Sequence, residues 1–202
     1  MSLTEQFQRF RAFDDRHRWL IDADLTYCSG RFLLLSDDFV FRPTGGYLLH
    51  QASEKYLKTL SRVVLPQTEI RRLHNLTKLL ADLEGKMETS SFKKITNSIK
   101  NIEALRLFRY VDQQATQDIQ TMQKGWKAVD YLVASLRKNI DESEPFIAYK
   151  GLRRYITESN SKDQNLLIDS LLRNNSSAKY WIEHLSGMNG RIDRKLKKYQ
   201  AI

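Results

Sequence analysis

The sequence predicts an all-α fold, and three observations support this class. Apolar residues recur at helical spacing in every long segment, most clearly over residues 45–65, where Ala52, Tyr56 and Leu60 follow one another at intervals of four. Glycine and proline are scarce, with 8 and 3 in a chain of 202 residues, which favours helices over sheets. No stretch alternates apolar and polar residues for long enough to indicate a strand. A hydrophobic content of 41% is sufficient for a buried core.

Two helices are predicted in the N-terminal region, at residues 3–13 and 17–35. Residues 3–13 carry a leucine and three phenylalanines on one face. Residues 17–35 continue the pattern, with apolar residues separated by charged ones. Residues 36–44 are predicted to form a loop that contains Pro43.

The central helix is predicted at residues 45–65. Gly45 and Gly46 are predicted to precede its first turn, where the conformational freedom of glycine does not destabilise the helix. Pro66 ends the helix, because proline disfavours the helical conformation in the residue before it.

The next segments complete the predicted bundle. A short helix is expected at residues 68–83, and the polar, basic residues 86–100 carry apolar side chains at helical spacing. The helical pattern returns at residues 102–110. The last long helix has an apolar stripe that starts at Ile119 and is expected to end near Asn139.

Residues 1–140 are therefore predicted to form an antiparallel helical bundle, and residues 141–202 a helical C-terminal extension. Residues 141–145 are the candidate linker. The extension has enough apolar residues to pack on the bundle. Its helical patterns lie at residues 146–157, 166–172, 178–185 and 191–199.

The composition narrows the function classes. The formal net charge of +9 favours polyanionic partners, nucleic acid first, although a basic helical bundle without such a partner has the same composition. The lone cysteine, Cys28, excludes an intramolecular disulfide and a cysteine-based zinc site, which fits a reducing compartment. No apolar run approaches the roughly 20 residues that span a bilayer, and the N-terminus has no signal-peptide core. We expect a cytoplasmic protein that does not enter a membrane.

Five segments carry a resemblance to one known family. LLHQASEKYLKTL (residues 48–60) closely resembles the second helix of HEPN domains, the higher eukaryote and prokaryote nucleotide-binding family. WLIDADLTYCSGRFLLL (19–35) resembles the family's first helix, and RRLHNLTKLLADLE (71–84) its short histidine-containing helix. ALRLFRYVD (104–112) and WKAVDYLVASLRKNI (126–140) resemble the segments that follow. The resemblance implies a HEPN-like bundle, a homodimer with a polar cleft near its twofold axis, and a nucleotidyltransferase or antitoxin partner on a separate chain.

The resemblance also raises the question of ribonuclease activity. Many HEPN proteins cleave RNA with an arginine followed, after four to six residues, by a histidine. Histidine can move a proton at the 2′-hydroxyl and arginine can hold the phosphate. Only Arg11 and His17 have this spacing here, they precede the first core helix, and RLFRYVD (106–112) contains no histidine. We predict a non-catalytic nucleotide- or RNA-binding module; the alternatives are a metal-independent ribonuclease, such as a toxin, using Arg11, His17 and His74, and a protein-interaction scaffold.

His50, Glu54 and Arg109 are the candidate cleft residues implied by the family-like segments. Glu54 lies on an otherwise apolar helix, so its charge is expected to need a partner, which Arg106 or Arg109 could provide. The alternative is a half-exposed Glu54 that pairs only with Lys58, four residues later. Histidines in such helices more often pack or cap than catalyse. No metal site and no cofactor are expected, because the histidine spacing fits no metal and there is no glycine-rich phosphate loop.

Two basic stretches are candidate nucleic-acid contacts, although solvated helix faces would have the same composition. Lysine and arginine near phosphates give affinity that depends on salt and not on sequence. Trp181 and Tyr199 flank the second stretch and could stack on bases. The candidate residues are Lys93, Lys94, Lys100, Arg106 and Arg109 in the first stretch, and Arg191, Arg194, Lys195, Lys197 and Lys198 in the second.

Overall fold

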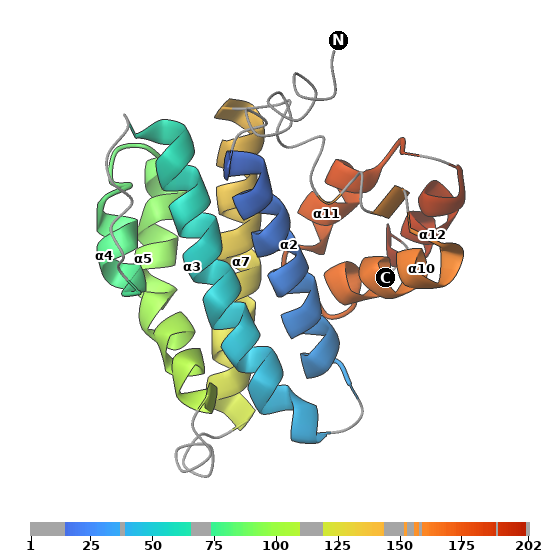
Figure 1. The fold of residues 1–202 in the computed structure, drawn as a ribbon, viewed down its shortest axis with the longest axis horizontal. Helices are drawn as coiled ribbons and strands as arrows, with labels where there is room; N and C mark the ends of the chain where they lie inside the picture. Colours follow the sequence, from blue (N-terminus) through green and yellow to red (C-terminus); the bar gives the residue numbers. More distant parts are fainter. Residues whose placement is uncertain are drawn as a thin grey trace, which may run out of the picture.

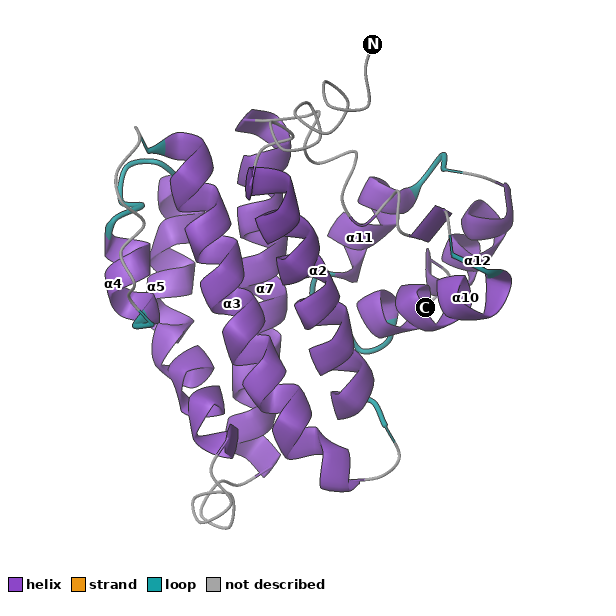
Figure 2. Cartoon of the chain, in the orientation of Figure 1, coloured by secondary structure: helices purple, strands orange, loops and turns teal. Residues whose placement is uncertain are grey.

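A computed structural model describes residues 15–36, 39–65, 74–109, 119–143, 152, 156–157, 159–188 and 190–200. Every regular element in these ranges is a helix and none is a strand, which confirms the all-α prediction (Figure 2). None of the described helices combines the length and the apolar character that a bilayer crossing requires.

Four long helices stand side by side, and neighbours along the chain run antiparallel (Figure 1). The shorter α4 (Leu76–Ala81) lies beside α5 at one edge. The 3-10 turns η1 (Phe39–Phe41) and η2 (Leu105–Arg109) lie before α3 and after α5. The long helices are α2 (Asp15–Leu34), α3 (Arg42–Val64), α5 (Thr89–Ala104) and α7 (Ile119–Ser143).

Helix α3 is the centre of the bundle, and it packs against α2, α7 and η2. Its apolar residues follow the helical repeat, so one face of the helix reaches the core along its whole length. Leu49, Ala52, Tyr56 and Leu60 are fully buried, and Leu48, which was expected to be buried with them, is half-buried. Burial of each such leucine stabilises the fold by about 1.5–3 kcal/mol.

The C-terminal helices form a second cluster against the free side of α2 (Figure 1). They are α10 (Ser161–Leu172), α11 (Ala178–Leu185) and α12 (Gly190–Gln200). Trp181 of α11 is fully buried and stacks on Tyr27 of α2, with the ring centroids 5.9 Å apart. The extension therefore shares a core with the bundle, as its apolar content predicted.

The start of α3 differs from the prediction. The helix begins at Arg42, so Pro43 lies in its first turn, where a missing N–H costs nothing. Gly45 and Gly46 are inside the helix and buried, not before it. The reason is tertiary: α2 and α3 approach so closely that a Cβ atom on Gly45 would lie 2.8 Å from the Gly30 carbonyl oxygen. Within the predicted loop over residues 36–44, residues 39–41 instead form η1 and residues 42–44 the first turn of α3.

Other boundaries moved less. The Asn75 side chain caps α4 by accepting from the Lys78 N–H, while Thr68 lies outside the described residues, as does the segment 3–13. The helix predicted at 102–110 is the end of α5 followed by η2. Helix α7 continues to Ser143, so the linker proposed at 141–145 begins inside a helix.

The glycine contact between α2 and α3 gives a first prediction. Gly45→Ala should destabilise the protein by about 1–3 kcal/mol, because the new methyl group meets backbone atoms that cannot rotate away. Gly46→Ala is the matched control, since its Cβ would meet only side chains at ordinary distances, Phe108 at 3.4 Å and Leu105 at 3.6 Å. The control should stabilise the helix by about 0.5–1 kcal/mol. Urea unfolding of both variants measures the difference, and equal effects would contradict the close approach.

Candidate functional site

Helix α5 presents basic side chains because its apolar residues are confined to the opposite side. Ile95, Ile99 and Ile102 are buried against the bundle. Between Thr89 and Ile102 the helix has three lysines and no acidic residue. We call the four exposed cations of α5 and the adjoining η2 the α5 basic face: Lys93, Lys94, Lys100 and Arg106.

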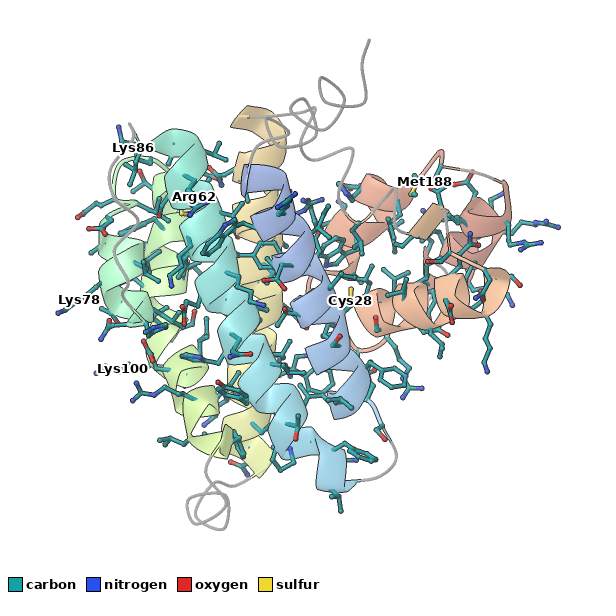
Figure 3. All side chains as sticks on the ribbon, viewed as in Figure 1. Cys28, Arg62, Lys78, Lys86, Lys100 and Met188 are labelled. Atoms are coloured by element: carbon teal, nitrogen blue, oxygen red, sulfur yellow. The ribbon has the colours of Figure 1, made fainter. Side chains whose placement is uncertain are left out.

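The charges of the α5 basic face are not neutralised by neighbours. Within the described ranges, no carboxylate lies within salt-bridge distance of Lys93, Lys100 or Arg106. Lys94 places its Nζ 3.8 Å from the centre of the Tyr131 ring, a cation–π contact that leaves its charge intact. Figure 3 shows Lys78, Lys86 and Lys100 along the same edge of the molecule, next to α4 and α5. The one acidic residue within α5, Glu103, is half-buried and bonded to His50 and the Leu76 N–H, so the exposed charges of the helix are positive.

His50 and Glu103 form a polar link behind the α5 basic face. His50 Nε2 lies 3.3 Å from Glu103 Oε2, and Glu103 Oε1 accepts from the Leu76 N–H at 2.8 Å. The glutamate thus satisfies an orphan N–H in the first turn of α4 and joins α3, α4 and α5. Burial lowers the pKa of His50 below 6.5, although the bond to Glu103 opposes this shift.

Glu54 lies one turn after His50 on α3 and contacts one lysine and one histidine. Its Oε1 is 2.6 Å from Lys58 Nζ and 3.0 Å from His74 Nδ1. The His74 side chain is 77% exposed and that of Glu54 only 15%. Arg106 was expected to supply the partner charge, but it lies in η2, and Glu54 contacts Lys58 and His74 instead. An exposed imidazole held by a carboxylate is a group that can transfer protons.

Several candidate residues cannot be placed. Arg11 lies outside the described residues. His17 and Arg109 belong to α2 and η2, but their side chains are not described. Their predicted roles therefore stay predictions.

Helix α12 docks as its spacing predicted, with Ile192 and Leu196 buried and Tyr199 half-buried. Lys195 is the exception among its cations. Its Nζ lies 3.0 Å from Asp169 Oδ1 and donates to the Asn165 carbonyl at 2.8 Å, so it does not point outward as expected. The remaining cations are exposed: Arg191, Arg194, Lys197 and Lys198.

The base-stacking role suggested for the aromatic residues beside α12 was wrong for Trp181. This side chain has no exposed surface, because it fills the space between α11 and Tyr27. The Tyr199 hydroxyl donates to Asp169, and its ring is only half-buried.

Sequence reasoning missed a buried network that joins the bundle to the extension. Arg31 Nη1 lies 2.7 Å from Asp130 Oδ1, and both side chains are fully buried. Tyr27 donates to the same carboxylate at 2.7 Å. The sequence did show that these charged residues lie on otherwise apolar helix faces. It gave no indication of which of them contact each other, because the partners are about a hundred positions apart.

A second set of buried polar groups lies nearby. Tyr56 donates to Asp24, and Arg137 Nη1 lies 3.7 Å from the other oxygen of that carboxylate. Arg137 Nη2 is 3.1 Å from His184 Nε2 on α11. These contacts connect α2, α3, α7 and α11 through the centre of the molecule.

The chain matches no protein-family model, no curated protein and no solved structure at a significant level. In the part of the chain that the structure describes, no group of three or more histidine, cysteine or acidic side chains could hold a metal ion. The residues themselves are therefore the basis for a functional argument.

The His50–Glu103 link gives a prediction about pH. Because the folded state lowers the pKa of His50, the unfolded chain binds the proton more tightly, and stability should fall as pH decreases below about 6.5. The slope contributed by one proton is at most about 1.4 kcal/mol per pH unit. His50→Gln should make the decline between about pH 7 and 5 shallower, as measured by urea unfolding at each pH. Parallel curves for wild type and variant would show that His50 does not contribute.

Proposed function

We propose that the chain is a non-catalytic RNA-binding module of HEPN-like architecture that holds phosphates on the α5 basic face. The observation that supports this most is the group of exposed cations on α5 and η2, among which the one acidic residue, Glu103, is turned to His50 and the Leu76 N–H. Each phosphate neutralised by such a cation releases counterions, which favours binding at low salt. The net charge of +9 adds long-range attraction for a polyanion.

The non-catalytic role is supported by the sequence between Arg106 and Asp112, which has no histidine where the HEPN ribonuclease motif would lie. From the resemblance we also infer a homodimer in the cytoplasm, with a nucleotidyltransferase or antitoxin as the partner on a separate chain. The lone cysteine, buried as a thiol, is consistent with that reducing compartment. A monomeric mass at tens of micromolar in light scattering would contradict the dimer.

The α5 basic face is tested by replacing Lys93, Lys100 and Arg106 together with alanine. Binding to a short single-stranded RNA, followed by fluorescence anisotropy at several salt concentrations, should weaken. The slope of log K against log salt should become shallower by about 0.7 for each phosphate that the variant no longer neutralises. Thermal stability should change little, because exposed charges contribute little to folding.

The matched control is the triple alanine variant of Arg194, Lys197 and Lys198. It removes the same net charge from α12, at the opposite side of the molecule from α5 (Figure 1). The control should retain most of the affinity and the wild-type salt slope. Equal reductions in both variants would show a non-specific effect of net charge, and unchanged affinity in both would favour a protein-interaction scaffold instead.

The contact between His74 and Glu54 favours one second candidate, metal-independent RNA cleavage. The carboxylate at Nδ1 orients the exposed imidazole and leaves its Nε2 towards solvent, as a general base or acid requires.

Cleavage of a fluorogenic RNA in the presence of a chelator tests this second candidate. If His74 is catalytic, His74→Ala should lower kcat/KM by about 10²–10⁴-fold. The exposed Thr77→Ala serves as the control for the local surface. Our leading proposal expects no cleavage above background by the wild-type protein.

A further inference from the structure

A pocket of about 680 Å³ lies between α7 and the turn that joins α10 to α11, and no function considered so far uses it. Its walls are the first half of α7, the turn between α10 and α11, and the end of α12. This volume falls in the range of small-molecule and cofactor sites. The lining residues are Gln123, Trp126, Lys127, Leu172, Arg173, Asn174, Asn175, Ser176, Ala178 and Tyr199.

The lining combines aromatic rings with positive charge. Trp126 and Tyr199 are both half-buried, while Lys127 and Arg173 are exposed. None of the lining residues is acidic. Two acidic groups are bonded to the lining, and both charges are compensated: Asp169 by Lys195 and the Tyr199 hydroxyl, and Asp130, which is bonded to the Ser176 backbone, by Arg31.

Buried contacts beneath the pocket fix its walls. Arg31 is bound to Asp130 of α7 and donates to the carbonyl oxygens of Ser170 and Arg173 at the end of α10. Its guanidinium carbon lies 5.1 Å from the centre of the Trp126 ring. Arg31 therefore fixes both the α7 wall and the α10–α11 turn, and it also packs against the Trp126 ring.

The turn itself is held by its own side chains. Asn175 donates to the Tyr27 hydroxyl at 3.0 Å and accepts from the Ser177 N–H at 2.7 Å. Asn174 adopts φ 53°, a left-handed conformation that asparagine tolerates better than most residues. A turn fixed at this many points does not need to reorganise when a ligand binds, which favours affinity.

We propose that this pocket binds a small planar aromatic anion of the nucleoside monophosphate class. Its base would pack against Trp126, and its phosphate would be held by Lys127 and by the N–H groups of Arg173 other than Nη2, which donates to the Leu35 carbonyl at 2.7 Å. The inference goes beyond the RNA-binding proposal and does not rest on it, because the two surfaces share no residue. A free mononucleotide and the 5′-terminal nucleotide of an RNA present the same chemistry.

Isothermal titration calorimetry with AMP, UMP, adenosine and ribose 5-phosphate tests the pocket on the full chain. The two nucleotides should bind at least about tenfold more tightly than the compounds that lack the phosphate or the base. Lys127→Glu should weaken AMP binding at least about tenfold, because it places a carboxylate beside the phosphate. Lys124→Glu is the matched control: the same charge change on an exposed residue of α7 outside the pocket lining.

Two results would overturn the proposal: no difference between Lys127→Glu and Lys124→Glu, or equal binding of AMP and ribose 5-phosphate. Lack of AMP binding to the wild-type protein would do the same. A 5′-phosphorylated trinucleotide distinguishes the two sources, since tighter binding than AMP assigns the pocket to an RNA end and weaker binding assigns it to a free nucleotide. Retention of AMP binding by the triple variant of the α5 basic face separates this inference from the RNA-binding proposal.

Discussion

The ion pair between Arg31 and Asp130 is the interaction on which much of this architecture depends. Both side chains are fully buried, so each charge needs the other to remain in the core. The remaining N–H groups of Arg31 reach Ser170 and Arg173, and thereby tie the extension to α2 and α7. Removing one partner of such a pair costs about 3–5 kcal/mol, a large part of the stability of an ordinary domain. The extension is thus linked to the bundle by polar contacts as well as by the stacking of Trp181 on Tyr27.

The two proposed binding surfaces are positioned by different buried contacts. The α5 basic face is positioned by apolar packing of α5 on the bundle and by Glu103, which links α3 and α4. The pocket between α7 and the α10–α11 turn is positioned by Arg31. Such a division lets one surface bind an extended polyanion while the other binds a compact ligand. Helix α7 contributes to both, because it packs against α5 and also forms one wall of the pocket.

Much of the fold could be predicted from sequence because helical periodicity is a local signal. The helix predicted at 178–185 has the bounds of α11, and the stripe of Ile192 and Leu196 correctly identified the buried face of α12. Predictions that depended on distant neighbours failed. Gly45 looked like a helix boundary until α2 was seen against it, and Lys195 looked solvated until Asp169 was seen beside it. The pocket lining is drawn from three separate segments, so no local pattern could have indicated it.

The lone cysteine has a practical consequence that follows from its place on α2. Cys28 is only 3% exposed, and burial raises the pKa of its thiol to about 12, so almost no thiolate is present near neutral pH. Alkylating reagents attack the thiolate, and therefore the native chain is protected until α2 separates from its neighbours. Because the chain has a single thiol, mass spectrometry of the labelled fraction over time counts one event per molecule. The labelling rate of Cys28 therefore reports how often the core opens, and no probe has to be introduced.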